Sequence, residues 1–474
     1  MGMITRGSAP SSFFYMSESA NARDRLSSRL GFLLLAAGCA IGLGNIWKFP
    51  YMVGEYGGGA FVLVYLVCLV AIGIPMLSVE LAMGRGSQSS PVRMYRSLKS
   101  EKSRWNVHGY VCLAGTVLLM AFYTVVTGLL LRYVVLAVTG GFEGLTSAGS
   151  ETLFETQTGD PLIMVGFTLM VVILGFLICS LPLNNGLERI NKVMMIALLT
   201  ILVVLAVNSI MVPGAAEGLR FYLVPDLDRM AEHGFLNILV AAMSQAFFTL
   251  SIGIGSMAIF GSYLGKDRAL FGESASIAVI DLFVAFVSGL VIFPACMSYG
   301  VAVDSGPDLL FITLPAIFSN MSYGTVWGTL FFVFLFYAAM STVMAVFECI
   351  VASCRELFGW SRGKSSLICL VAMSLIVLPC ALGYNILSWV EPLGAGSSIQ
   401  DLEDFIVSYL LLPGGALVFL IFCTSRYGWG WDSYLAEVNA GEGVKVRPWM
   451  RVYMTYVLPI VVGVILVAGL VSMF

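Results

Sequence analysis

The sequence is poor in charged residues and in histidine. Only 11% of its 474 residues are Asp, Glu, Lys or Arg, whereas a soluble globular protein usually contains about 25%. The net charge of −3 offers no basic surface for nucleic acid. The two histidines, His108 and His233, leave little basis for a histidine-ligated metal centre. These deficits argue against a soluble domain, a nucleic-acid-binding protein and a His-based metalloenzyme.

The sequence also lacks any paired arrangement of cysteines. Its ten cysteines lie in or beside apolar stretches, and none has the CxxC spacing of a zinc site. We therefore interpret them as small core residues and expect neither a disulfide framework nor an organic cofactor.

What the chain has in abundance is apolar sequence. Hydrophobic residues make up 59% of it and the mean hydropathy is +0.92, which indicates an integral membrane protein. A helix needs about 20 apolar residues to cross a bilayer, and eleven runs are long enough. These predicted spans cover residues 29–54, 58–84, 106–138, 161–181, 188–211, 234–264, 270–300, 323–355, 364–383, 399–425 and 449–473.

The distribution of basic residues predicts the orientation of these spans. If the N-terminus lies inside, 21 of the 25 Lys and Arg residues fall in inner segments, and only Arg220 and Arg229 fall in outer loops. Because inner loops of membrane proteins carry the excess of positive charge, we expect the N-terminus inside. An odd number of spans then places Phe474 outside.

Two spans carry a Gly-Xaa-Gly sequence near their middle, Gly42-Leu43-Gly44 in the first and Gly253-Ile254-Gly255 in the sixth. Each glycine weakens a helix by about 1 kcal/mol relative to alanine, so the helices can unwind there. Irregular backbone at membrane depth survives only where it lines a cavity or a ligand. The alternative is that these glycines merely permit close helix packing.

Matched breaks in spans 1 and 6 predict two five-span halves that enter the membrane from opposite sides, as in many secondary transporters. The expected division is a flexible cytoplasmic segment, a core of ten spans made of two repeats, and a cytoplasmic loop with the eleventh span. These units cover residues 1–25, 26–425 (repeats 29–211 and 234–425) and 426–474.

Among the ionisable residues within spans, five are candidates for a functional role, namely Lys48, Glu80, Asp281, Glu348 and Asp404. A charge in the membrane costs about 3 kcal/mol or more, so each needs a reason. Asp281 lies about eleven residues into span 7, where a cation partner is the least costly explanation and hydrogen bonds to backbone or a lysine are the alternative. Glu80 is equally compatible with a structural helix-to-helix hydrogen bond and with function.

Several of these segments resemble one known family. The motifs are Arg29-Leu30-Gly31-Phe32, Gly42-Leu43-Gly44-Asn45-Ile46-Trp47-Lys48-Phe49-Pro50-Tyr51, Gly57-Gly58-Gly59-Ala60-Phe61 and Glu80-Leu81-Ala82-Met83-Gly84-Arg85. They are similar to those of the neurotransmitter:sodium symporters, most of all to the bacterial amino-acid branch. The resemblance implies an all-α, LeuT-type 5+5 inverted repeat with 11 transmembrane helices, of which helices 1 and 6 are discontinuous.

The resemblance also implies two sodium sites built from oxygen ligands, which a small hard cation requires. The first would combine the substrate carboxylate with Ala40, Asn45, Thr249 and Asp281. The second would use Gly38, Ile41, Ala338, Ser341 and Thr342. Without the resemblance, the hydroxyls of span 8 would be interpreted as bonded to their own helix.

For the substrate, the resemblance implies that the N–H groups of Leu43 and Gly44, with the Tyr123 hydroxyl, hold a carboxylate. The broken part of span 1 has a small residue where monoamine carriers have an aspartate, so the substrate should bring its own carboxylate. The other expected pocket residues are Cys39, Ala40, Gly42, Leu119, Phe248, Thr249, Ser251, Ile254, Thr342 and Val346.

Two gates complete the implied site. The outer gate would consist of Lys48, Asp404, Tyr123 and Phe248, and the inner gate of Arg23, Tyr263 and Glu356. Lys48 stands where most members have an arginine, so a point charge replaces a bidentate group. In span 5, Ile196 stands where many relatives have a proline, which leaves open how ions are released inward along that helix.

We therefore expect a sodium-coupled secondary transporter, not an enzyme, that imports a neutral, hydrophobic L-amino acid with two sodium ions. Its partners would be the substrate, sodium and the lipid bilayer of a bacterial inner membrane, with the chain as a monomer or homodimer. Asp281 and Ala285 predict independence of chloride, because a carboxylate already balances the ion and alanine cannot donate to an anion. The alternative is a non-transporting amino-acid sensor of the same fold.

Overall fold

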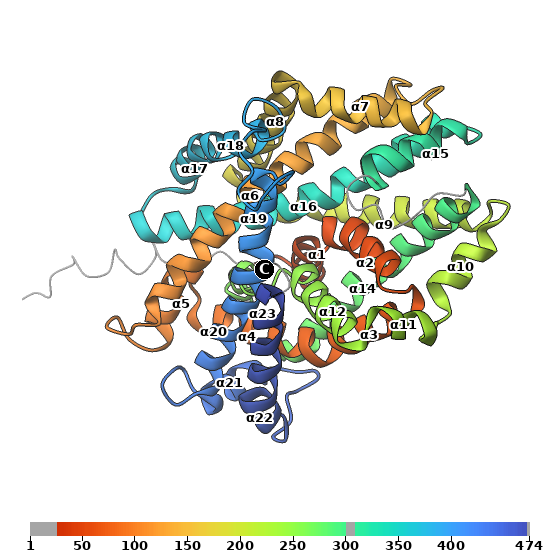
Figure 1. Cartoon of the computed structure of the whole chain (residues 1–474). Helices are drawn as coiled ribbons and strands as arrows, with labels where there is room; N and C mark the ends of the chain where they lie inside the picture. Colours follow the sequence, from red (N-terminus) through yellow and green to blue (C-terminus); the bar gives the residue numbers. More distant parts are fainter. Residues whose placement is uncertain (1–25, 300–308, 472–474) are drawn as a thin grey trace, which may run out of the picture.

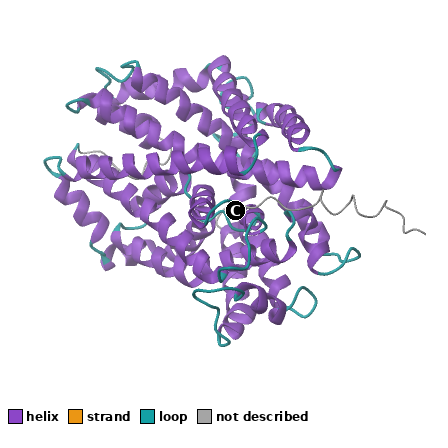
Figure 2. Ribbon diagram, turned by 180° about the vertical axis from the view of Figure 1, so that it is seen from behind, coloured by secondary structure: helices purple, strands orange, loops and turns teal. Residues whose placement is uncertain are grey.

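The computed structural model describes residues 26–299 and 309–471, and within these ranges the chain is helical, with two isolated β-bridges (Figures 1 and 2). The predicted segment 1–25 lies outside the described residues. The helices, with π-helical segments written η, are α1 (Arg29–Ala40), η1 (Gly44–Lys48), α2 (Phe49–Glu55), α3 (Gly59–Cys68), η2 (Leu69–Gly73), α4 (Ile74–Ser87), α5 (Pro91–Leu98), α6 (Asn106–Val138), α7 (Ser147–Gly159), α8 (Pro161–Ser180), η3 (Asn184–Glu188), α9 (Arg189–Ile210), α10 (Ala215–Leu223), α11 (Leu227–His233), α12 (Phe235–Thr249), α13 (Ser256–Gly261), α14 (Leu270–Ser298), η4 (Leu309–Thr313), α15 (Leu314–Asn320), α16 (Gly324–Phe358), α17 (Arg362–Ile376), α18 (Leu378–Leu382), α19 (Ile399–Phe405), η5 (Ile406–Leu411), α20 (Leu412–Thr424), α21 (Trp431–Val438), α22 (Met450–Val452), η6 (Tyr453–Val457) and α23 (Leu458–Val471).

Nine helical stretches of the described chain are long and apolar enough to cross a membrane, and the pair Arg29–Ala40 and Gly44–Glu55, bent by 58°, makes a tenth. Their bounds agree with ten predicted spans to within a few residues. The predicted span 234–264 differs, because it is divided into α12 and the short α13 by a non-helical stretch.

The helices α6 and α16 form the centre of the molecule. In each, 78% of the most apolar stretch is buried, compared with 28% in the last span, Met450–Val471. Next to the two breaks, α1 and α13 pack against α16, and α1, α2 and α12 lie near the middle of Figure 1. One flank of each break is therefore held against a deeply buried helix.

The first break follows Ala40, where α1 ends and Ile41 adopts an extended conformation. The freed N–H group of Leu43 donates to the Tyr123 hydroxyl oxygen at 3.0 Å. The carbonyl of Gly44, at the start of η1, accepts a hydrogen bond from the Gln245 side chain at 2.7 Å. Polar side chains of α6 and α12 thus replace the helical hydrogen bonds that the break removes.

The second break lies between α12 and α13 and uses left-handed backbone, with φ of 111° at Gly253 and 80° at Gly255. A Cβ atom at Gly253 would lie 2.0 Å from the carbonyl oxygen of Leu412. Unwinding and close packing, proposed as alternatives from the sequence, therefore occur together at this glycine.

The carboxylate of Glu80, fully buried on α4, spans this second break. It accepts hydrogen bonds from the N–H groups of Gly253 at 3.0 Å and Met257 at 3.1 Å. An anion at the start of α13 also interacts favourably with the helix dipole. Of the two roles left open for Glu80, the structure supports a structural one.

We predict that Glu80→Ala lowers thermal stability, because it leaves two buried N–H groups unpaired at about 1–3 kcal/mol each. The measurement is thermal unfolding of the purified protein in detergent. Glu80→Gln, which retains an acceptor oxygen, is the control and should lose less. Equal melting temperatures for all three proteins would contradict this role.

Candidate functional site

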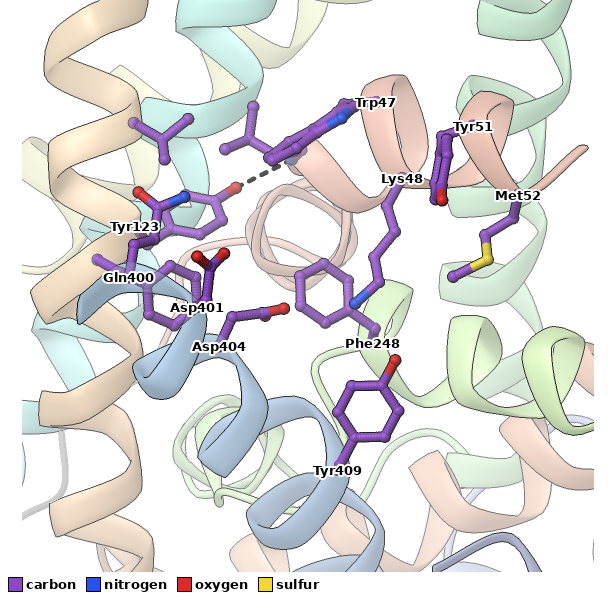
Figure 3. A pocket seen from close by; sticks show the side chains of 13 residues that line it. Trp47, Lys48, Tyr51, Met52, Tyr123, Phe248, Gln400, Asp401, Asp404 and Tyr409 are labelled. Carbon is purple, nitrogen blue, oxygen red and sulfur yellow. Dashed lines mark hydrogen bonds between the residues drawn. The ribbon is translucent and has the colours of Figure 1, made fainter. Parts of the chain in front are cut away.

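The candidate site consists of two adjoining cavities that share Tyr123 and Phe248 in their walls. The larger has a volume of about 550 Å³ and is shown in Figure 3. The smaller has a volume of about 20 Å³. Because the same two aromatic side chains line both, they form the partition between a wide vestibule and a compact site at the helix breaks.

Most of the predicted substrate residues line the smaller cavity. Its lining consists of Cys39, Ala40, Gly42, Gly44, Leu119, Tyr123, Phe248, Ser251, Thr342 and Leu412.

Leu43 lines the vestibule. Ile254 and Val346 are buried but belong to the lining of neither cavity, and Ile254 instead packs where a Cβ of Gly115 would be. Leu412 was missed, although it begins a Leu-Pro-Gly-Gly sequence that marks an irregular helix.

The position of Tyr123 leaves no room for a side chain in the broken part of α1. A Cβ atom at Gly42 would lie 2.3 Å from the Tyr123 hydroxyl oxygen. The N–H of Leu43 points at the same hydroxyl. An N–H at a helix start beside a phenol hydroxyl is suited to an anionic group of a ligand.

The predicted first sodium ligands Asn45, Thr249 and Asp281 meet beside this cavity, all at most 1% exposed. The Asp281 carboxylate accepts a hydrogen bond from Asn45 Nδ2 at 2.8 Å. It also accepts from the Thr249 hydroxyl at 3.1 Å. Ala40, the fourth predicted ligand, lines the small cavity. The hydrogen bonds to this buried carboxylate come from neutral groups, so a cation could supply the balancing charge.

The five predicted residues of the second sodium site also meet. The Ser341 hydroxyl donates to the carbonyl oxygens of Gly38 at 2.9 Å and Ala338 at 2.8 Å. The Thr342 hydroxyl lies 3.2 Å from the Gly38 carbonyl oxygen and 3.3 Å from that of Ile41.

The reason for this gathering is that α1 ends here. The last carbonyls of a helix have no partner in the next turn. Here the carbonyls of Gly38, near the end of α1, and of Ile41, just after it, face the hydroxyls of α16. The carbonyl of Cys39 accepts a hydrogen bond from the Ser251 hydroxyl at 3.0 Å. Carbonyl and hydroxyl oxygens of this kind are the ligands that a hard cation prefers, so the cluster fits sodium.

The outer gate residues Lys48 and Asp404 lie on opposite sides of the vestibule (Figure 3). The Lys48 ammonium stands over the ring of Phe248, 4.1 Å from its centre. The Asp404 carboxylate accepts a hydrogen bond from the Ser408 hydroxyl at 2.7 Å. Both charged groups therefore line the same cavity, each with a different neighbour. Gln400 and Asp401, which were not predicted, also line it.

Of the predicted inner-gate residues, Tyr263 contacts Glu348, a carboxylate within span 8 to which the sequence assigned no partner. The Tyr263 hydroxyl donates to Glu348 at 2.7 Å, and Arg362 pairs with the same carboxylate at 2.5 Å. Glu356 accepts hydrogen bonds from the N–H and hydroxyl of Ser90 at 2.9 Å and 2.6 Å. Arg23, the third predicted inner residue, lies outside the described residues.

Comparison with known proteins agrees with this arrangement. The model of the Sodium:neurotransmitter symporter family matches residues 23–145 and 156–474. The chain is 35% identical over 416 residues to YhdH of Bacillus subtilis, described as an uncharacterized sodium-dependent transporter, with 88% of this chain and 90% of the relative covered. It is 31% identical over 456 residues to MJ1319 of Methanocaldococcus jannaschii, which has the same description, with 93% and 89% covered.

The crystal structure of MhsT in complex with L-phenylalanine superimposes with a TM-score of 0.84 at 35% sequence identity, covering 94% of this chain and 100% of MhsT. The broken helices, the oxygen clusters and these relatives lead to one conclusion. This chain is an integral membrane protein with the LeuT fold of MhsT and belongs to the sodium:neurotransmitter symporter family, whose members are sodium-dependent transporters and not enzymes.

Proposed function

We propose that the protein imports a neutral, hydrophobic L-amino acid together with sodium by alternating access. The observation that carries this proposal is the small cavity, whose described lining joins apolar walls such as Leu119 and Leu412 to the oxygen-rich helix breaks. No Asp, Glu, Lys or Arg is in that lining. The phenylalanine complex of MhsT supports the same class of substrate.

In this proposal the substrate carboxylate lies at the Leu43 and Gly44 N–H groups and the Tyr123 hydroxyl. The carboxylate would complete the sodium site of Ala40, Asn45, Thr249 and Asp281. A second ion would replace the hydrogen bonds that Ser341 and Thr342 make to the α1 carbonyls. Two sodium ions would thus be transported with each substrate.

We further propose eleven membrane crossings, with α12 and α13 together forming the broken sixth. The basic residues favour an N-terminus inside and a C-terminus outside. Residues 29–211 and 234–425 would then be inverted repeats, preceded by the cytoplasmic segment 1–25 and followed by a loop and last span in 426–474. Spans 1, 2, 6 and 7 would rock against spans 3, 4, 8 and 9 in a bacterial inner membrane.

The substrate class is tested by competition against sodium-driven uptake of labelled L-phenylalanine in proteoliposomes. Leucine, methionine or phenylalanine in excess should compete. Glutamate and lysine should compete at least about a hundredfold less well, because burying an unpaired charge costs several kcal/mol. Competition by glutamate as strong as that by leucine would contradict the proposal, and sodium-dependent binding without uptake would favour the sensor alternative.

Uptake should not require chloride. Asp281 provides the negative charge beside the first sodium, and Ala285, one turn later on α14 and fully buried, offers no hydrogen-bond donor to an anion. Replacement of chloride by gluconate should leave uptake unchanged. The double variant Asp281→Asn, Ala285→Ser should acquire chloride dependence, and loss of wild-type uptake without chloride would refute the assignment.

The outer gate predicts that Lys48→Ala or Asp404→Ala weakens uptake by about fivefold, the effect of losing a partly solvated ion pair of about 1 kcal/mol. Both side chains are half-buried, and we propose that they approach when the vestibule closes over the substrate. Lys48→Arg, which keeps the charge, is the matched control. Initial uptake rates equal to wild type in both alanine variants would show that these residues do not form the gate.

A further inference from the structure

A buried amide on α9 has no hydrogen-bond partner for its oxygen within the part of the chain that the structure describes. Asn191 is 1% exposed. Its Nδ2 donates to the Leu34 carbonyl oxygen at 2.9 Å, whereas its Oδ1 has no hydrogen-bond partner among the described residues. Because nearly all buried polar atoms are paired, an unpaired acceptor in a membrane helix suggests a ligand.

This amide adjoins the second oxygen cluster. A Cβ atom at Gly38 would lie 3.0 Å from both Oδ1 and Nδ2 of Asn191, so a side chain there would push the amide away by a few tenths of an ångström. The carbonyl of the same Gly38 accepts the hydrogen bond of Ser341. The unpaired oxygen therefore lies on the α9 side of the residue that connects the proposed second sodium site to α1.

One turn earlier in the chain, Glu188 provides a second buried oxygen group. It is 4% exposed and accepts hydrogen bonds from the Ser27 N–H at 2.9 Å and the Ser27 hydroxyl at 2.5 Å. The Ser28 hydroxyl contacts it at 3.4 Å. These donors are neutral. A Cβ atom at Gly31 would lie 1.8 Å from Glu188 Oε1, so a glycine again makes room for the oxygen.

The two groups share one seam between α1 and α9. Gly31 and Gly38 lie seven residues apart on α1, a distance of about 10 Å along the helix. Glu188, the last residue of η3, and Asn191, near the beginning of α9, are three residues apart and lie on one face of the helix that η3 and α9 form together. Their oxygens therefore follow each other from the second cluster toward the beginning of α1, which is the proposed cytoplasmic end.

We propose that Asn191 Oδ1 and, after it, the Glu188 carboxylate are the successive ligands of a third, transient sodium site between the second cluster and the cytoplasm. The inference rests on the proposed sodium-coupled transport. An ion that leaves the hydroxyls of α16 exchanges them first for the amide oxygen and then for the carboxylate. The helix α9 is continuous and has Ile196 where many relatives have a proline. The site would therefore give the departing ion oxygen ligands beside a helix that does not unwind.

The test compares two transport modes in proteoliposomes with labelled L-phenylalanine. Net uptake driven by a sodium gradient requires sodium release inside, whereas exchange at saturating sodium on both sides does not. Asn191→Leu, which keeps the side-chain size and removes the oxygen, should lower net uptake about tenfold and leave exchange within about twofold. A loss of equal size in both modes, or no loss in either, would overturn the third site.

Two further variants complete the experiment. Asn208→Leu, at the other end of α9, is the matched control and should retain both modes. Asn191→Asp keeps an oxygen and adds a charge, so internal sodium should inhibit uptake at about tenfold lower concentration; inhibition unchanged from wild type would also overturn the third site. Absence of sodium-driven uptake in the wild type would refute the proposed function itself, which is a different result from a selective failure of the variants.

Discussion

Backbone groups that lose their helical partners inside a membrane constrain the rest of this structure. Hydrocarbon offers them no hydrogen bonds, so a broken helix survives only where protein groups or ligands replace the lost partners. At the end of α1, the hydroxyls of Ser341 and Thr342 contact freed carbonyls. At the start of α13, the Glu80 carboxylate binds freed N–H groups. Many polar residues of these apolar spans are thus explained by the breaks.

The same replacements give the protein a means of coupling. The hydroxyls of α16 and the carbonyls of α1 are held together by hydrogen bonds that a cation can replace with stronger contacts to the same oxygens. An ion bound there would stabilise arrangements in which α1 and α16 remain close. A ligand shifts a conformational equilibrium only through such a difference in binding, so ion occupancy and helix position become linked in the proposed transport cycle.

Pattern in the sequence was sufficient for the breaks, whereas the hydroxyls of Ser341 and Thr342 that gather at the first break were implied only by the family resemblance. Paired glycines located both interruptions, and an aspartate deep in an apolar span identified Asp281. The individual partners were less predictable, because they depend on helix rotation and on local backbone angles. The backbone at Ser251 has an unusual φ of 51°, and Ile254, three residues later, lines neither cavity.

The charged groups illustrate the same limit. Lys48 was expected to approach Asp404 when substrate is enclosed, and this stays a prediction; in this structure its ammonium lies over the ring of Phe248. Glu348 could be recognised as an ion in a span, but its pairing with Arg362 depends on how the beginning of α17 folds back against α16. The unpaired oxygen of Asn191 could not be recognised from the sequence around it, because its surroundings include Gly38 of another helix.

The central claim is that the helix breaks hold sodium and substrate with shared ligands. Equilibrium binding of radioactive sodium to the purified protein, with and without L-phenylalanine, tests it most directly. If the substrate carboxylate completes the site of Asn45 and Asp281, phenylalanine should raise sodium affinity by about tenfold or more, since coupling between two ligands is reciprocal. The variant Asp281→Asn should lose this effect. A wild-type sodium affinity that is the same with and without phenylalanine would contradict the claim.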